Sequence, residues 1–379
     1  MKILVVGAGF TGSVISRELA NSGHNVTVID QRSHVAGNCF TKRDENTSIM
    51  EHVYGPHIFH TSNEYVWKYI CSYCDMVPYI NQVKTTYNNG VYSLPINLHT
   101  INQFYDSSFS PSEAKEFIKK VADNSIIEPD NFEEQALKFI GKELYEAFFK
   151  GYTIKQWGVN PKSLPASILQ RLPVRFNYND NYFSHKYQGI PRDGYTPIIE
   201  KILTHKNIEV LLNVSFCECS DDYDHIIWSG KLDEWFGYSQ GKLGYRTLRF
   251  EKHTQDGDFQ GTAVMNYGNE EIPFTRISEH KHFTPWESHD KTIYFKEFSS
   301  LCGDDDIPYY PIRLVNDKLI LDKYFSLAEK TSGVTFAGRL GSYRYMDMDI
   351  TIKEALELSA KLLDDIDNGV APKSFYHQE

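Results

Sequence analysis

The chain has 379 residues, and at about 150 residues per domain this length predicts two or three domains. Hydrophobic residues make up 41% and charged residues 23%, which excludes the disordered and coiled-coil classes. The formal net charge of -11 disfavours binding to nucleic acid or anionic lipid, and no apolar run approaches the roughly 20 residues of a membrane span. We therefore expect a soluble protein with no nucleic acid and no membrane among its partners.

Residues 2–30 predict a strand, a glycine turn, a helix and a second strand. The turn carries Gly7, Gly9 and Gly12, and the second strand ends at Asp30. In dinucleotide-binding folds these glycines allow a tight turn, close approach to a pyrophosphate and close packing of the helix, while the acid accepts hydrogen bonds from ribose. The unit therefore predicts an ADP-containing cofactor.

The rest of the chain divides into three further stretches. Between about 97 and 170 the pattern is helical, with helices starting near Pro111 and Asn131. From about 172 to 330 short strand-like runs favour an antiparallel sheet. A buried strand at 333–338 and a closing amphipathic helix then predict a return to the first domain.

The six cysteines are too sparse for a disulfide scaffold, so we expect free thiols. Cys71 and Cys74 have the spacing of a metal or redox pair, but no second pair stands at zinc spacing, and we predict no metal. The chain opens directly on a strand pattern with no leader segment, which favours a cytoplasmic location. Aromatic residues reach 14%, enough for stacking on sugars and ring cofactors as well as for the core.

Longer motifs point to one family. They are AGN at 36–38, YGPHIFHT at 54–61, KGYTIKQWG at 150–158, RLPVRF at 171–176, NYF at 181–183, YQGIP at 187–191, EHKHF at 279–283, PYYP at 308–311, GRL at 338–340 and YRYMDM at 343–348. This ordered series, over about residues 2–365, closely resembles the bacterial UDP-galactopyranose mutases. It is far more specific than the glycine turn alone.

The resemblance implies an α/β fold. It consists of a discontinuous Rossmann-like FAD-binding domain (1–80, about 195–235 and 331–379), an inserted helical domain with the start of a mobile loop (81–170), and an antiparallel β-sheet domain (171–194 and 236–330). It also implies a cytoplasmic homodimer that supplies galactofuranose for surface polysaccharide.

The implied activity is an isomerase reaction between UDP-galactose in its pyranose form and UDP-galactofuranose, with FAD active in its reduced form. In that family N5 of the reduced flavin attacks the anomeric carbon of the sugar and expels UDP, so no side-chain nucleophile is required. The sequence accordingly has no G-x-S-x-G or H-E-x-x-H motif.

Matching positions carry the family's roles to this chain. Guanidinium groups can pair with the diphosphate, tyrosine hydroxyls can donate to it, and aromatic faces can hold uracil. The implied catalytic residues are Arg171, Arg276, Tyr310, Tyr345 and His60. The implied substrate-binding residues are Asn81, Phe148, Phe149, Tyr152, Thr153, Trp157, Tyr182, Asn266 and Asp347. The implied cofactor-binding residues are Gly7, Gly9, Gly12, Asp30, Arg32, Gly37, Asn38, His57, Arg246, Gly338, Arg339 and Met348.

Three departures from the family pattern leave the choice of sugar open. They are Ala36, Pro56 and Asp193, and none removes a charged or stacking group. The presence of His60 favours galactose, while a mutase acting on UDP-N-acetylgalactosamine stays an alternative. The same fold also serves flavin-dependent oxidoreductases, and a non-catalytic sensor of nucleotide sugar or FAD is a third possibility.

Overall fold

The N-terminal strand, helix and strand form as their sequence predicts. In this computed structural model, which describes residues 1–171, 174–219, 222–312 and 318–376, β1 (Lys2–Val6) and β2 (Asn25–Asp30) are parallel and are joined by α1 (Phe10–Asn21). Three later strands complete a five-stranded parallel sheet in the order β10-β2-β1-β11-β17, with β10 at Ile208–Leu212, β11 at His225–Trp228 and β17 at Val334–Phe336. This sheet confirms the Rossmann-like fold, and its strands come from three separate stretches of the chain.

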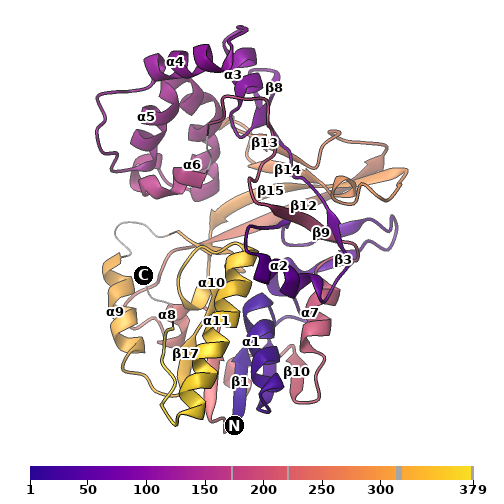
Figure 1. Cartoon of the computed structure of the whole chain (residues 1–379), viewed down its shortest axis with the longest axis vertical. Coiled ribbons are helices and arrows are strands. Elements are labelled where there is room, and N and C mark those ends of the chain that lie inside the picture. The colour runs from indigo at the N-terminus through magenta and orange to yellow at the C-terminus, as the bar shows by residue number, and fades with distance from the viewer. Residues whose placement is uncertain (172–173, 220–221, 313–317, 377–379) are drawn as a thin grey trace.

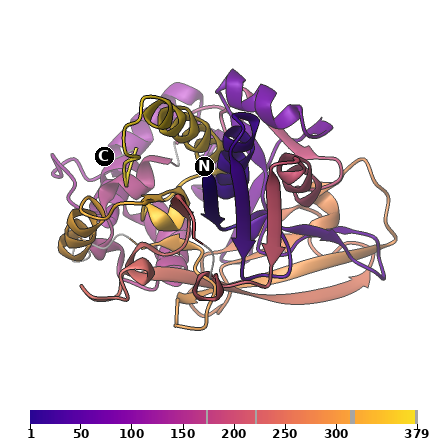
Figure 2. The ribbon, with the colours of Figure 1, turned by 90° about the horizontal axis from the view of Figure 1, so that it is seen from below.

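Helices cover both faces of the parallel sheet. On one face α1 packs against α7 (Thr196–Leu203) and against the closing helix α11 (Met348–Asp367), which lies beside α1 in both ribbon views (Figures 1 and 2). Their shared core includes Ile15, Leu19 and Ile352. A second cluster joins Trp228 of β11 and Phe336 of β17 to the helices α8 (Leu232–Trp235) and α9 (Lys318–Ala328).

A seven-stranded sheet lies above the parallel sheet in Figure 1. Its strand order is β16-β12-β15-β14-β13-β7-β8, with β16 at Tyr310–Pro311, β12 at Tyr245–Asp256, β15 at Lys291–Leu301, β14 at Arg276–Glu279, β13 at Val264–Tyr267, β7 at Val83–Tyr87 and β8 at Gly90–Leu94. All neighbouring pairs are antiparallel except β13 and β7. The long β12–β15 ladder is its centre.

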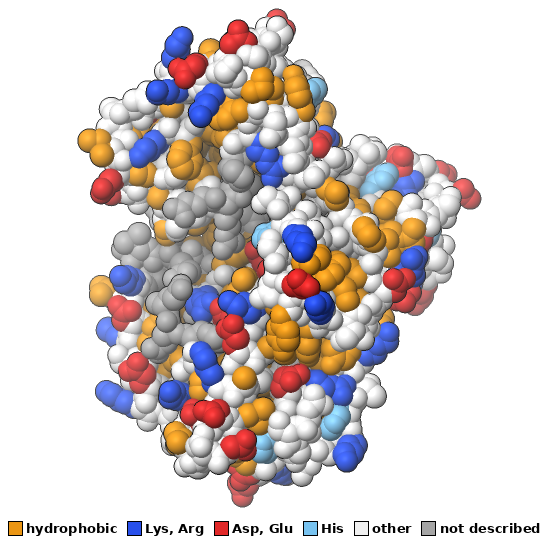
Figure 3. Space-filling view, viewed as in Figure 1, with side chains coloured by type: hydrophobic (Ala, Val, Ile, Leu, Met, Phe, Trp, Pro, Cys, Tyr) orange, Lys and Arg blue, Asp and Glu red, His pale blue; other side chains and the backbone are white. Residues whose placement is uncertain are grey.

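The helical part forms the top of the molecule in Figure 1. It comprises α3 (Leu98–Phe104), α4 (Pro111–Val121), α5 (Phe132–Tyr145), the π-helix η2 (Glu146–Lys150), α6 (Gly151–Trp157) and the 3-10 turns η3 (Pro161–Ser163) and η4 (Ala166–Arg171). The predicted helix starts have a local cause, because Ser110 and Glu113 form a capping box and the Asn131 side chain accepts from the Glu134 N–H. A hollow opens on one side between this part and the parallel-sheet part (Figure 3).

Short elements connect the three parts. They are the 3-10 turns η1 (Gly37–Cys39), η5 (Phe216–Glu218) and η6 (His280–Phe283), the helices α2 (Glu64–Cys71) and α10 (Gly338–Gly341), the paired strands β3 (Thr41–Arg43) and β4 (Met50–His52), and the three-stranded sheet of β5 (Phe59–Thr61), β9 (Tyr187–Pro191) and β6 (Met76–Pro78).

The structure differs from the expected domain limits in two places. The segment 83–94, expected in the helical domain, forms the β7–β8 hairpin at the edge of the seven-stranded sheet. The segment 187–191, expected in that sheet, pairs instead with β5 and β6. Both differences arise because strand pairing depends on distant partners, and the local pattern does not identify them.

The six cysteines are free thiols in the structure, as predicted. None of the helices within the described ranges combines the length and the apolar character that crossing a bilayer requires.

Gly141 provides a test of the helical packing. It lies inside α5 at φ 74°, and a Cβ there would stand 2.4 Å from the carbonyl oxygen of Val121 at the end of α4. With ψ 176° this is a backbone region that essentially only glycine adopts, so we expect Gly141→Ala to cost about 1–3 kcal/mol for the backbone and about 1–3 kcal/mol more for the clash. Gly257→Ala is the matched control, since Gly257 has φ 69° with nothing within 4 Å. Denaturant unfolding should show the larger loss for Gly141→Ala, and equal losses would contradict this account.

Candidate active site and cofactor cleft

A cleft of about 550 Å³ runs along the carboxyl edge of the parallel sheet. Every residue predicted for the cofactor except Arg246 lines it. These residues are Gly7, Gly9, Gly12, Asp30, Arg32, Gly37, Asn38, His57, Gly338, Arg339 and Met348. Ligands of open parallel sheets bind at this edge, so the cleft has the position that a dinucleotide requires.

The glycine turn leaves no room for side chains on the wall of this cleft. A Cβ on Gly12 would lie 1.9 Å from the carbonyl oxygen of Gly7, and one on Gly37 would lie 3.3 Å from Cα of Gly9. Helix α1 begins just after Gly9, which has no capping side chain for the N–H groups of the first turn. Such a bare helix start is suited to bind the pyrophosphate of a dinucleotide.

Asp30 and Arg32 stand at the end of β2, beside the turn. The Asp30 carboxylate accepts hydrogen bonds from the backbone N–H groups of Ala8 and Arg32, both at 2.9 Å. Each carboxylate oxygen keeps a second lone pair with which to accept from ribose hydroxyls. The Arg32 guanidinium donates from Nη2 to Asn38 at 2.9 Å, while its Nη1 is buried without a partner among the described residues. An unpaired guanidinium N–H in this cleft fits an anionic cofactor.

Sequence reasoning missed an aromatic group on the opposite wall. Phe216, Trp228 and Trp235 line the cleft, and their rings meet edge to face or tilted at centroid distances of 5.2–5.4 Å. Flat apolar walls of this kind suit a nucleobase. They come from three separate elements, and no local motif joins them.

Arg276 is the charged centre of a second group of side chains. It begins β14, and its Nε donates to the Glu297 carboxylate on β15 at 2.8 Å. Burial by itself would lower the pKa of Arg276, but the adjacent Glu297 raises it above its ordinary value. Arg276 has a cross-strand partner on each neighbouring strand. The partner on β13 is Asn266, and the partner on β15 is Glu297. The three side chains therefore share one face of the sheet.

Three tyrosines predicted for the substrate surround this guanidinium. Tyr152, Tyr182 and Tyr310 each interact electrostatically with Arg276. Burial raises the pKa of all three phenols above their ordinary value. They are therefore neutral hydroxyls, which can donate hydrogen bonds to an anion without adding charge.

Trp157 and Tyr345 flank the Tyr310 ring. The centroid distance is 5.7 Å to Trp157 and 6.0 Å to Tyr345, both edge to face. The Tyr310 hydroxyl also accepts from the side-chain amide of Gln156. Tyr345 is 37% exposed, and the Arg339 guanidinium of the cofactor cleft lies over its ring at 5.0 Å. The two groups of predicted residues are therefore adjacent.

Two of the predicted residues are histidines. Burial lowers the pKa of His57, which lines the cleft, to about 4, so its imidazole is neutral at physiological pH. Its Nδ1 lies 2.8 Å from the Gly55 carbonyl oxygen. Burial also lowers the pKa of His60, while the nearby Asp347 carboxylate raises it. His60 stacks on Phe183 at 3.6 Å, and its Nδ1 lies 3.0 Å from Nδ1 of His185, a partner that sequence reasoning missed.

The remaining predicted residues take different positions. Asn81, Asn266, Phe149 and Thr153 are buried, and the side-chain oxygens of the two asparagines have no hydrogen-bond partner among the described residues. Such oxygens are available to a polar ligand. Phe148 packs instead between the β7–β8 hairpin and α3, against rings of Tyr87, Tyr92 and Phe104.

Arg246 does not join the described lining of the cofactor cleft. Its guanidinium donates to Ser299 Oγ at 2.9 and 3.1 Å and to the Lys155 carbonyl at 3.3 Å. It therefore connects β12 to β15 and to the end of α6, because the side chain is directed across the sheet. The side chain of Arg171 lies outside the described part of the chain.

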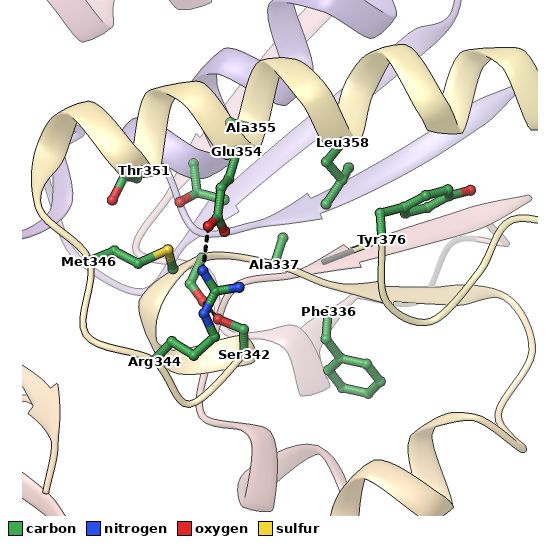
Figure 4. A pocket seen from close by; sticks show the side chains of 12 residues that line it. Phe336, Ala337, Ser342, Arg344, Met346, Thr351, Glu354, Ala355, Leu358 and Tyr376 are labelled. Carbon is green, nitrogen blue, oxygen red and sulfur yellow. Dashed lines mark hydrogen bonds and ion pairs between the residues drawn. The ribbon is translucent and has the colours of Figure 1, made fainter. Parts of the chain in front are cut away.

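A small cavity of about 20 Å³ adjoins the cleft beneath α11 (Figure 4). It has room for about one water molecule. Arg344 and Glu354 form an ion pair at its wall, drawn dashed in Figure 4. This pair ties the turn that carries Tyr345 and Asp347 to the closing helix.

Comparisons with known proteins agree with this arrangement. A family model described as UDP-galactopyranose mutase matches residues 147–345, and one described as an NAD(P)-binding Rossmann-like domain matches residues 5–73. A probable UDP-galactopyranose mutase of Klebsiella pneumoniae is 58% identical over 367 residues, which cover 97% of this chain and 96% of that protein. A dTDP-fucopyranose mutase of Escherichia coli is 51% identical, with 94% and 97% of the two chains covered.

A solved structure shares the fold. The crystal structure of a reduced UDP-galactopyranose mutase superposes with a TM-score of 0.75 over 99% of this chain and 98% of its own, at 15% identity.

The glycine cradle yields a direct prediction. We expect Gly12→Ala to lower the flavin content of the purified protein about tenfold, or about 1.4 kcal/mol of binding free energy, because the new Cβ displaces the turn that faces the cofactor. The ratio of visible flavin absorbance to protein absorbance measures this. Gly23→Ala is the control, since its site is open and lies outside the cleft. Full flavin content in Gly12→Ala would contradict the assignment.

Proposed function

The chain belongs to the UDP-galactopyranose mutase family, and we propose that it interconverts UDP-galactopyranose and UDP-galactofuranose with reduced FAD as its cofactor. The observation that carries this proposal is the charged Arg276, ringed by neutral tyrosines beside a dinucleotide cleft. A cation among hydroxyl donors suits a diphosphate. The expected cytoplasmic homodimer that supplies surface polysaccharide belongs to the same proposal.

The cleft residues that would hold the FAD are those of the glycine turn, Asp30, Arg32 and Arg339. When bound and reduced, the flavin supplies the nucleophile for the anomeric carbon of the sugar. The protein's own residues then have three tasks, which are to bind the diphosphate, to stabilise it as it departs and to exclude water.

Arg276 performs the second task. The leaving UDP gains negative charge as its bond to the sugar breaks, and a guanidinium already in place stabilises this charge without reorganisation. Glu297 holds that guanidinium in one orientation through Nε, which leaves its two Nη groups for the diphosphate. The hydroxyls of Tyr182, Tyr310 and Tyr345 add donors to the same oxygens.

The 51% identity to a protein named dTDP-fucopyranose mutase supports a second candidate substrate. dTDP-fucose differs from UDP-galactose by a thymine methyl group, by the lack of the ribose 2′-hydroxyl and by the lack of the sugar 6-hydroxyl. A site built to bond a hydroxyl rejects an analogue that lacks it. UDP-N-acetylgalactosamine is the third candidate.

The first test is conversion. UDP-galactofuranose incubated with the purified flavin-loaded protein should give UDP-galactopyranose when dithionite is present and nothing when it is absent. Chromatography of the nucleotide sugars measures both samples. The furanose forms of dTDP-fucose and UDP-N-acetylgalactosamine, run in parallel, rank the three substrates by kcat/KM.

The outcomes separate the proposals. Higher kcat/KM for the dTDP sugar would replace the substrate and keep the mutase chemistry. Stoichiometric reoxidation of the flavin by the substrate would instead indicate an oxidoreductase, because a mutase leaves the flavin redox state unchanged.

Arg276 gives the second test. Arg276→Ala should lower kcat on the order of 100-fold, about 3 kcal/mol of transition-state stabilisation. Because this change also strands the buried Glu297, the double variant Arg276→Ala with Glu297→Gln separates catalysis from misfolding. Arg249→Ala, an exposed arginine on β12, is the matched control. Near-normal turnover in the double variant would refute the role of Arg276.

A further inference from the structure

Lys155 occupies a cage of backbone carbonyls. It lies on α6, and its Nζ is within hydrogen-bond distance of four carbonyl oxygens, those of Tyr267, Asn269, Ile272 and Phe274, at 2.6, 2.8, 2.9 and 3.0 Å, which its three N–H donors share. The carboxylate that acts on it electrostatically is that of Glu270, which belongs to the same loop. Burial lowers the pKa of Lys155 to about 8, so the side chain is an ammonium at neutral pH. Rings of carbonyl oxygens are also how proteins replace the water around a monovalent cation.

The loop that forms this cage connects two residues of the candidate site. It runs from the end of β13, where Asn266 stands, to the start of β14 at Arg276. A second contact joins the loop to the start of α6, since a Cβ on Gly151 would lie 2.1 Å from the carbonyl oxygen of Gly268. Lys155 and Gly151 therefore hold the helix to the loop at two points.

The other end of α6 is held from the sheet. Ser299 Oγ donates to the Gln156 carbonyl at 2.7 Å, and Arg246 donates to the Lys155 carbonyl. These bonds satisfy carbonyls that a helix end leaves unpaired. The helix that carries Tyr152 and Trp157 is thus fixed between two strands and one loop, and Lys155 contacts that loop with its ammonium group.

We propose that Lys155 is a positioning residue that serves as the internal cation of the 267–274 loop and thereby sets α6 against Asn266 and Arg276. Tyr152 and Trp157 come from the helix, and Asn266 and Arg276 from the two strands that the loop joins. Their mutual distances then depend on the ammonium group of Lys155 together with the Gly151–Gly268 contact. The consequence for nucleotide binding rests on the proposed function, whereas the anchoring itself does not.

The anchoring is tested without any nucleotide. Amide hydrogen exchange of the flavin-loaded full chain should be faster over 151–157 and 266–276 in Lys155→Met than in the wild type. Lys142→Met is the matched control, because Lys142 is 77% exposed and makes one surface ion pair in the same helical part. Exchange in Lys155→Met equal to that of the control would overturn the proposal.

Nucleotide affinity gives the second readout. UDP, measured by calorimetry, should bind about tenfold more weakly to Lys155→Met, while the flavin content stays unchanged. Lys155→Gln keeps two N–H donors, so its UDP affinity should lie between those of the wild type and Lys155→Met. Should Lys155→Met not fold, Lys155→Gln carries the same test. UDP affinity within twofold of the wild type in both variants would overturn the positioning role.

Chemical rescue tests the cationic nature of the contact. Lys155→Ala removes the ammonium group and leaves the carbonyl oxygens of the cage without a cation. Added methylammonium or K⁺ should therefore restore at least half of the lost UDP affinity. Tetramethylammonium at the same ionic strength should restore none, because its methyl groups leave it neither N–H donors nor, as in K⁺, a bare charge that the carbonyl oxygens can coordinate. The cation role would be overturned if all three salts changed the UDP affinity equally, or if none of them changed it. If wild-type protein bound no UDP, the proposed function would fail, and the hydrogen-exchange comparison would still decide the anchoring.

Discussion

The arrangement of the site depends on keeping one guanidinium charged inside the protein. Arg276 is held by the buried Glu297 carboxylate, and this partner more than offsets the effect of burial on the arginine. Glu297 is buried, whereas 28% of the Arg276 side chain is exposed, so the guanidinium is accessible from outside the pair. An accessible guanidinium held in place by a buried carboxylate is suited to bind a ligand of opposite charge. The neutral Tyr152, Tyr182 and Tyr310 fit the same explanation, because they add hydrogen-bond donors where further charge would repel.

The two sheets contribute different chemistry to one place. The parallel sheet supplies a glycine-lined cleft for a dinucleotide, and the seven-stranded sheet supplies Arg276 with its neighbours. His57 and Arg339 line the cleft, and both have electrostatic or ring contacts toward the second group. Tyr195, which is fully buried, donates to the His57 carbonyl at 3.1 Å and so fixes that segment from α7. The cleft residues and the Arg276 group therefore adjoin each other, which is the arrangement that the proposed function requires.

Local patterns predicted the parts that depend on neighbouring residues. The glycine turn, the capped helices at Pro111 and Asn131, and the closing helix all formed where expected, because caps and amphipathic periodicity act within a few residues. The family resemblance is also confirmed by the comparisons. Two predicted residues lie elsewhere in the structure. Arg246, predicted for the cofactor, bonds Ser299 and α6 and does not join the described cleft lining. Phe148, predicted for the substrate, packs against Phe104.

The sequence alone thus determined the dinucleotide-binding unit, the family and the glycines and charged residues that line part of the cleft, since these follow from contiguous motifs. Only the tertiary structure decided which strands pair and which side chains from different segments meet. The β7–β8 hairpin joined the larger sheet, the rings of Phe216, Trp228 and Trp235 formed one wall, and Lys155 entered a cage built more than a hundred residues away. The physical reason is the same in each case. Strand pairing and side-chain burial are set by partners distant in the chain, and a local pattern contains no information about them.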